Sequence, residues 1–259
     1  MLGRFCVKTA TLSILLLPAF ALASTGADED GIGRAEAGRI LAVAPMVEND
    51  AAQAYVNLVG NAIAKQTAAG YKWRFALVKS DAVNAFALPG GIVLVTTGMV
   101  QLLNNEDELA FVLSHEIAHV LQRHHYKMIM RQRLAEKAAN AANSQGGAAA
   151  TDLGNASAQI YARGLDKGAE FDADRIGVDW MTRAGYDPAA AMAVLSSLAG
   201  LATTEPRAEW LLSTHPRPGD RLDRLLQSGI DGLPRPAADK NVMAQRFKVV
   251  VQAVGVGKP

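Results

Sequence analysis

The chain has 259 residues, of which 50% are hydrophobic and 20% charged, and its formal net charge is +1. A charge this close to zero, without a basic cluster, excludes nucleic acid as the partner. The only cysteine, Cys6, lies within the first ten residues, so the rest of the chain forms no disulfide.

The N-terminal 23 residues have the pattern of an export signal. Arg4 and Lys8 precede an uncharged apolar stretch at 12–23, which ends in the small-x-small cleavage sequence ALA. A retained membrane anchor is the alternative, but the stretch is short and Pro18 interrupts it. We therefore expect the signal to be cleaved after residue 23 and the mature protein to reach the periplasm.

The mature chain, 24–259, is long enough to bury one substantial core, and nothing in its composition demands two domains. We expect a single domain with its core at about 50–228 and a tail at 232–259. No stretch after the signal approaches the roughly 18 uninterrupted apolar residues of a membrane span. The mature chain is therefore expected to be soluble and to contain no transmembrane segment.

In the first half of the mature chain the spacing of the apolar residues changes from that of a helix to that of a strand. Apolar residues at 35–68 recur at helix-like spacing with an interruption near Pro45, which predicts two helices. The segment 73–78 then alternates as a strand does, and the apolar runs 85–88 and 92–95 flank the turn sequence PGG. These runs predict a small antiparallel sheet that contains a hairpin.

A long helix is predicted in the middle of the chain. A short helix at 99–103 comes first, and Asn105 is a good N-cap for the long helix, which we expect to run past Arg133. The stretch 143–154 is rich in glycine and small residues and has no apolar stripe, so it is a candidate lid loop.

The last third is predicted to be mostly helical. Helices are expected at 165–184, at 188–201 and after Pro216, whereas 247–254 in the tail could form a strand. The fold class that follows is α+β and mostly helical, with a small antiparallel sheet beside the long helix.

The long helix carries the sequence HEIAH. Residues four apart in a helix lie about 40° apart around its axis, so His115 and His119 point the same way. Zinc binds imidazole nitrogens, and a catalytic zinc site uses three protein ligands and an open position. Glu116 can take a proton from water at the metal, which leaves a hydroxide to attack a carbonyl. Because the five residues also occur by chance on exposed helices, a third ligand has to be found.

His125 is one candidate for the third ligand. It stands at the third histidine of the metzincin pattern HEXXHXXGXXH, but Gln122 occupies the position at which that pattern needs glycine to leave the helix. If the helix continues, His125 lies about 240° and His124 about 140° around the axis from His119. Both are therefore expected to point away from the metal.

Glu170 is the other candidate. It lies four residues before Asp174, so the two carboxylates share a helix face. A glutamate-type zinc site needs such a pair: one carboxylate on the metal and one to accept the outer ring N–H of a ligand histidine. A solvated acidic first turn, favoured by the helix dipole, explains the same residues, and on the spacing alone it is the better explanation.

Four sequence blocks in order resemble the HtpX and CAAX-prenyl-protease type of zinc metalloendopeptidases, a glutamate-zincin family. They are NAFALPGG (84–91), ELAFVLSHEIAHVLQRH (108–124), EFDADRIGVDWMTRAGYDP (170–188) and STHPRPGDR (213–221). The resemblance implies one Zn²⁺ per chain bound by His115, His119 and Glu170, with Glu116 as the base, in a mostly helical fold with a small sheet. Within the family the chain is most similar to soluble periplasmic members.

The resemblance also draws attention to two residues of the last block. It implies that His215 lies close to the metal, where it is a candidate fourth ligand in a closed form; a simple helix entry before Pro216 is the alternative. Arg221 is a candidate for stabilising the oxyanion. Asp174 is expected to orient a ligand histidine.

The predicted hairpin offers a binding surface for substrate. An extended peptide that pairs with a strand edge gains main-chain hydrogen bonds whatever its sequence, which suits unfolded chains. Asn84 and Phe86 are candidate contacts, although Phe86 could equally belong to the core.

These features together predict an exported zinc metalloendopeptidase that hydrolyses misfolded or unassembled envelope proteins. The competing hypotheses are a zinc-binding, chaperone-like protein with little or no proteolysis and a helical structural protein whose HEIAH sequence is accidental.

Overall fold

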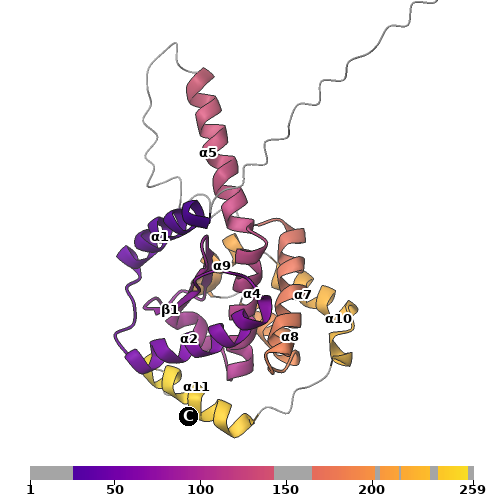
Figure 1. The fold of residues 1–259 in the computed structure, drawn as a ribbon. Helices are drawn as coiled ribbons and strands as arrows, with labels where there is room; N and C mark the ends of the chain where they lie inside the picture. Colours follow the sequence, from indigo (N-terminus) through magenta and orange to yellow (C-terminus); the bar gives the residue numbers. More distant parts are fainter. Residues whose placement is uncertain (1–25, 143–164, 202–204, 216, 234–238, 256–259) are drawn as a thin grey trace, which may run out of the picture.

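The computed structural model describes residues 26–142, 165–201, 205–215, 217–233 and 239–255 (Figure 1). The predicted export signal and the candidate lid loop at 143–154 lie outside these residues. The helices and strands are, in chain order, α1 Gly26–Val43, α2 Asp50–Ala64, β1 Arg74–Val78, β2 Ala85–Leu88, β3 Ile92–Thr96, α3 Thr97–Leu102, α4 Glu106–Leu121, α5 His124–Ala142, α7 Lys167–Arg183, α8 Ala189–Leu201, α9 Glu209–Thr214, α10 Pro218–Gln227 and α11 Lys240–Ala253, with short 3₁₀ helices at Lys65–Thr67, Pro206–Ala208 and Ile230–Gly232. The prediction of a mostly helical α+β fold is confirmed.

The sheet has the strand order β1-β3-β2. β2 and β3 form the predicted antiparallel hairpin, in which Gly90 and Gly91 supply the positive φ angles, 79° and 85°, that the turn requires. The prediction that the whole sheet is antiparallel is wrong, because β1 pairs with β3 in parallel. Alternation of apolar residues identifies a strand but does not say which strand becomes its neighbour or in which direction.

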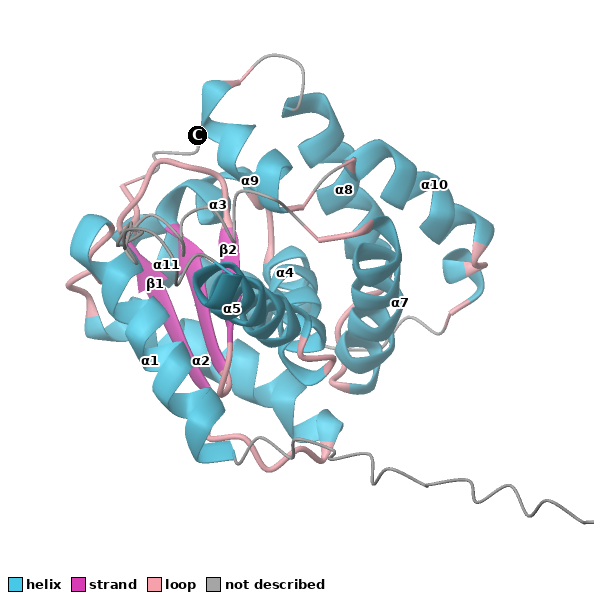
Figure 2. Cartoon of the chain, turned by 90° about the horizontal axis from the view of Figure 1, so that it is seen from above, coloured by secondary structure: helices cyan, strands magenta, loops and turns pink. Residues whose placement is uncertain are grey.

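Both faces of the sheet are covered by helices. Phe86 and Leu94 pack with Ile40 of α1 on one face, whereas Ala85 and Val95 belong to the main core on the other face. Figure 2 shows the sheet on one side of α4 and the helices α7, α8 and α10 on the other. Helix α4 is therefore the central element of the fold, and its residues from Glu106 to Val120 are all buried.

The first turn of α4 is capped as predicted. The Asn105 side chain accepts a hydrogen bond of 2.9 Å from the backbone N–H of Glu108. The acidic residues of this turn suit the positive end of the helix dipole.

The predicted single long helix is wrong, because the chain leaves α4 after Leu121. Arg123 adopts a left-handed conformation with φ of 57°, and a second helix, α5, begins at His124. An ion pair with Glu29 of α1 and a position 4.7 Å from the ring centre of Tyr126 hold the Arg123 side chain. Figure 1 shows α5 projecting from the body of the molecule.

The tail forms helix α11, so the strand predicted at 247–254 is wrong. Met243, Phe247 and Val250 recur at helical spacing and lie in the main core. Arg246 of the same helix forms a 2.5 Å ion pair with Glu106 at the start of α4. The tail is thus packed against the helix that carries the HEIAH sequence.

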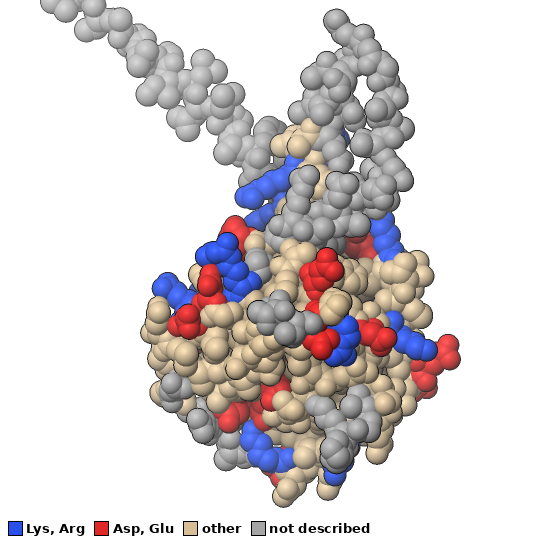
Figure 3. Space-filling model, turned by 180° about the vertical axis from the view of Figure 1, so that it is seen from behind, with Lys and Arg blue, Asp and Glu red and all other residues tan. Residues whose placement is uncertain are grey.

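Acidic and basic side chains are interspersed on the face of the molecule seen in Figure 3. Among the described helices, none combines the length and the apolar character that crossing a membrane requires.

Candidate metal centre

Helix α4 presents both histidines of the HEIAH sequence on one face. Nε2 of His115 and Nε2 of His119 lie 2.9 Å apart, and both side chains are buried. The spacing of four residues thus produces the convergence that the sequence predicts.

Helix α7 brings a carboxylate to this pair. The oxygens of Glu170 lie 3.6 Å from Nε2 of His115 and 3.5 Å from Nε2 of His119. The two helices can approach closely because position 177 is glycine: a Cβ atom there would lie 3.0 Å from the backbone nitrogen of His115. Gly177 therefore allows α7 to place Glu170 beside the histidines.

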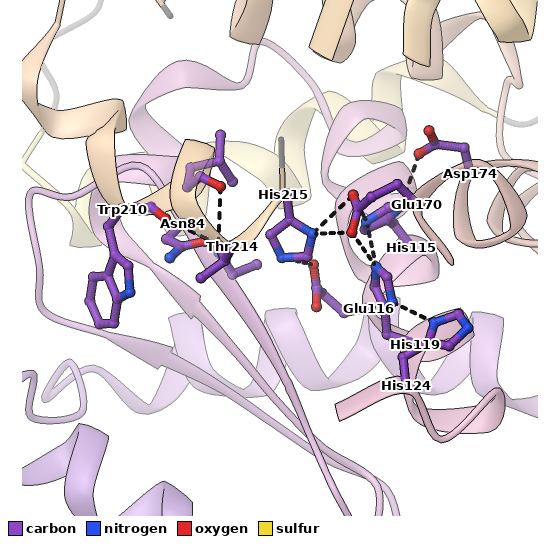
Figure 4. A network of polar contacts seen from close by, with 12 residues as sticks. Asn84, His115, Glu116, His119, His124, Glu170, Asp174, Trp210, Thr214 and His215 are labelled. Atoms are coloured by element: carbon purple, nitrogen blue, oxygen red, sulfur yellow. Dashed lines mark hydrogen bonds and ion pairs between the residues drawn. The ribbon is translucent and has the colours of Figure 1, made fainter. Parts of the chain in front are cut away.

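His215 reaches the same point from the end of α9. Its Nδ1 lies 3.1 Å from Glu170 Oε1, and its Nε2 lies 3.8 Å from Glu116 Oε1 (Figure 4). One potential ligand atom each from His115, His119, Glu170 and His215 lies within 4.8 Å of the others.

This donor set fits a zinc ion. Atoms bound at about 2.0–2.1 Å with tetrahedral geometry lie about 3.3–3.4 Å apart. The three separations among His115, His119 and Glu170, 2.9, 3.5 and 3.6 Å, bracket that value. Glu116 Oε2 is buried and has no hydrogen-bond partner among the described residues, so it is available to a water molecule at the site.

Asp174 and Arg221 support the ligands from behind. Asp174 Oδ1 lies 2.9 Å from Nδ1 of His115, which leaves Nε2 of that ring to face the donor set. Arg221 donates to both oxygens of Asp174 at 2.8 and 2.6 Å, and its third nitrogen lies 3.1 Å from Glu170. The guanidinium thus holds the two carboxylates in fixed positions.

Both carboxylates are ionised despite their burial. Burial alone would raise the pKa of Glu170, but electrostatic interactions with the neighbouring His215 and Arg221 hold that pKa well below its usual range. The pKa of Asp174 is lowered against the effect of burial by Arg221. The cluster therefore supplies the negative charge that a divalent cation requires.

The two histidines of α4 differ in their electrostatic environment. Burial and Arg221 oppose protonation of His115, but hydrogen bonds to Asp174 and Glu170 raise its pKa to about 9. Burial and the neighbouring His115 hold the pKa of His119 well below its ordinary value. The carboxylates beside His115 therefore favour its charged form, whereas the surroundings of His119 favour its neutral form.

The expectation that His124 and His125 point away from the site is wrong. It assumed a continuous helix, whereas the left-handed Arg123 turns both rings back toward α4. The ring centres of His124 and His125 lie 5.0 and 5.5 Å from that of His119. Neither histidine belongs to the group of potential metal ligands. Arg123 thus bends the chain where the metzincin pattern has its bend at glycine, but the bend does not bring His125 into the ligand group.

The two predicted substrate contacts lie on or beside β2. Asn84 is fully buried, and its Nδ2 has no hydrogen-bond partner among the described residues. Phe86 points to the opposite face of the sheet, where its ring centre lies 4.7 Å from that of Trp210. A small cavity beside Glu116 is lined by apolar residues of four helices, among them Val112, Val194, Leu198 and Leu211.

A sequence model of Peptidase family M48 matches residues 50–228. The chain belongs to peptidase family M48. This confirms the resemblance drawn from the four sequence blocks.

Similar proteins include the beta-barrel assembly-enhancing proteases. The protein from Yersinia pestis is 34% identical over 208 residues, which make up 76% of this chain and 43% of that protein. The protein from Escherichia coli (strain K12) is 30% identical over 190 residues, 69% of this chain and 39% of that protein. The mitochondrial metalloendopeptidase OMA1 of Schizosaccharomyces pombe is 33% identical over 159 residues, 60% of this chain and 46% of that protein. The chain thus spans less than half the length of these relatives.

Three residues beside the site were not predicted from the sequence. The contacts of His124 and His125 depend on the bend at Arg123, and no glycine marks that bend. Trp210 lies more than 120 residues after Phe86 in the chain, so only the fold brings the two rings together.

Proposed function

We propose that the mature chain is an exported zinc metalloendopeptidase, with one Zn²⁺ per chain held by His115, His119 and Glu170. The observation that carries the proposal is a buried set of three side chains, two imidazoles and one carboxylate, whose donor atoms lie 2.9–3.6 Å apart. Beside them, Oε2 of Glu116 has no hydrogen-bond partner among the described residues. Family membership supports the same assignment.

Zinc bound at this position would polarise a substrate carbonyl and lower the pKa of a nearby water. Glu116 then acts as the general base: its carboxylate accepts a proton from the attacking water and returns it to the nitrogen of the leaving amine. Asp174 fixes the orientation of His115 throughout, because it accepts the outer N–H of that ring.

Arg221 acts mainly on the carboxylates. Its guanidinium is committed to Asp174 and Glu170, so direct stabilisation of the oxyanion would require it to leave one of them. We therefore assign Arg221 as a positioning residue, with direct contact to the oxyanion as the alternative.

Substrate would bind along β2, the edge strand on the side of α4. Thr96 N–H donates to the carbonyl oxygen of Asn84, so by the alternation of an antiparallel ladder Ala85 and Ala87 direct their backbone groups away from β3. An extended peptide could pair with the backbone of Ala85 and Ala87, with Nδ2 of Asn84 as a further donor. The backbone groups of Phe86 face β3 and its ring packs on Trp210, so neither would contact the peptide. The small cavity beside Glu116, which apolar residues line together with His115, His215 and Arg221, would receive a small apolar side chain next to the scissile bond.

His215 would close this site. The segment 205–215 runs beside β2, where the carbonyl of Arg207 accepts from Val83 N–H at 2.9 Å and Trp210 covers Phe86. The same segment places His215 against Glu170, where its ring could serve as a fourth ligand and so exclude water and substrate from a bound metal. Turnover of casein by His215→Ala is expected to exceed that of wild type, whereas unchanged kinetics would remove the gating role.

The proposed substrates are misfolded or unassembled envelope proteins. The names of the bacterial relatives, beta-barrel assembly-enhancing proteases, support this class, as does the export signal predicted at the N-terminus. The same support favours a periplasmic location.

Proteolysis by Glu116→Gln tests the proposal, with Glu48→Gln, an exposed glutamate on the surface, as the matched control. Wild type and the control are expected to bind one zinc and cleave unfolded casein, whereas Glu116→Gln binds zinc and cleaves about 10²–10⁴-fold more slowly. Equal cleavage by all three would refute the mechanism. Zinc binding without cleavage by the wild type would favour a chaperone-like protein instead.

A further inference from the structure

All five histidines of the chain lie near the proposed metal centre, but the donor set uses only three of them. Of the other two, His124 makes the closer contact. Its Nδ1 lies 2.8 Å from Nδ1 of His119, with the rings 66° from coplanar (Figure 4). This distance is that of a hydrogen bond between two ring nitrogens.

The direction of that hydrogen bond follows from the use of the other nitrogen. A neutral imidazole carries one proton, and a nitrogen that faces a metal must offer its lone pair. Nε2 of His119 faces His115 and Glu170, so the proton of His119 belongs on Nδ1. His119 therefore donates to His124, whose Nδ1 must be unprotonated and whose own proton lies on Nε2.

The two ligand histidines are thus supported in different ways. His115 has the carboxylate of Asp174 on its outer nitrogen, at 2.9 Å. At the outer nitrogen of His119 the corresponding acceptor is the imidazole of His124. The outer partner of a ligand histidine fixes its tautomer and ring orientation and contributes to metal affinity.

The fold holds His124 in place through the bend between α4 and α5. A continued helix would carry His124 about 140° around the axis from His119. The left-handed Arg123 instead returns the chain toward α4, and Glu29 of α1 binds the Arg123 side chain. Glu29 also accepts a hydrogen bond of 3.0 Å from Tyr71, so the bend is tied to the segment before β1.

We propose that His124 is a positioning residue for the metal centre: it accepts the Nδ1 proton of His119 and so keeps Nε2 of His119 free and correctly oriented for the metal. The inference rests on the proposed function only in so far as it requires the chain to bind zinc.

The test is the zinc affinity of the full mature chain, measured by competition with a chromophoric chelator. His124→Leu removes the acceptor, and His124→Asn offers an amide oxygen in place of Nδ1. Lys127→Leu is the matched control, because Lys127 is an exposed residue of the same helix. Urea unfolding of each metal-free protein shows whether a variant remains folded.

We expect His124→Leu to bind zinc 10–100-fold more weakly than wild type, His124→Asn to recover most of the loss, and the control to match wild type. Long-range ¹H–¹⁵N spectra of the metal-free protein should place the His119 proton on Nδ1 in wild type and lose that preference in His124→Leu. Equal zinc affinity of His124→Leu and wild type would overturn the inference alone, as would an asparagine variant as weak as the leucine variant. A wild type that binds no zinc would overturn the proposed function as well.

Discussion

Arg221 is the residue whose removal separates support of the metal centre from direct catalysis. Only 3% of its surface is exposed, and its guanidinium forms contacts of 2.8 and 2.6 Å with Asp174 and 3.1 Å with Glu170. The substitution Arg221→Met keeps much of the length and apolar volume of the side chain but removes the charge. Two buried carboxylates then lose their cationic partner.

The expected loss of stability in Arg221→Met follows from the burial of these three side chains. Loss of one partner of a buried ion pair costs about 3–5 kcal/mol, and here a single arginine serves two carboxylates. The free energy of unfolding of the metal-free protein should therefore fall by at least about 3 kcal/mol, a large share of the 5–15 kcal/mol typical of a domain. With zinc bound the loss should be smaller, since the ion itself neutralises Glu170. Arg221→Lys should fall between, because lysine keeps the charge but cannot bind both carboxylates as a fork.

Urea unfolding followed by circular dichroism, with and without zinc, measures these differences. Arg175→Met on the exposed side of α7 is the control and should change stability by no more than about 0.5 kcal/mol. An Arg221→Met protein with wild-type stability and zinc affinity but a kcat about 10²–10³-fold lower would refute the positioning role and assign Arg221 to the oxyanion.

Three further predictions concern the packing around α4. Gly177→Val inserts a side chain at a position where even a Cβ atom would lie 3.0 Å from the backbone nitrogen of His115. The overpacking should lower the free energy of unfolding by about 1–3 kcal/mol and weaken zinc binding, which calorimetry measures. An unchanged zinc affinity would contradict the close approach of α7. Phe247→Ala should destabilise the protein by about 3–5 kcal/mol in urea unfolding, and a change below about 1 kcal/mol would show that α11 is not part of the core. Asn105→Ala should cost about 1 kcal/mol in the same measurement through loss of the hydrogen bond to Glu108, and Asn105→Asp should retain most of it.

Local signals in the sequence predicted the central features of the site. The spacing of His115 and His119 is a property of one helix, and the Asn105 cap needs only the next three residues. Glu170 could not be chosen from spacing alone, since an acidic first turn fits the same residues. The four ordered sequence blocks indicated its role, and the structure brings it within 3.6 Å of both histidines.

The features that were mispredicted depend on contacts between distant segments. Nothing local to Arg123 signals a left-handed residue, because the ion pair with Glu29 and the packing on Tyr126 supply the stabilisation that glycine would give elsewhere. Similarly, β1 pairs with β3, which is not its neighbour in the sequence, and the spacing of apolar residues within one strand does not identify its partner. The apolar tail residues fit a strand or a helix until their packing against the core is known.

The central claim is that His115, His119 and Glu170 form a catalytic zinc site. X-ray absorption at the zinc edge of the purified mature protein tests it most directly, because the spectrum reports the type and distance of the ligands. The account predicts one zinc per chain with imidazole nitrogen at about 2.0–2.1 Å and carboxylate oxygen at about 2.0–2.2 Å, and loss of the oxygen contribution in Glu170→Ala. Absence of stoichiometric zinc, or a coordination sphere that does not change in Glu170→Ala, would contradict it.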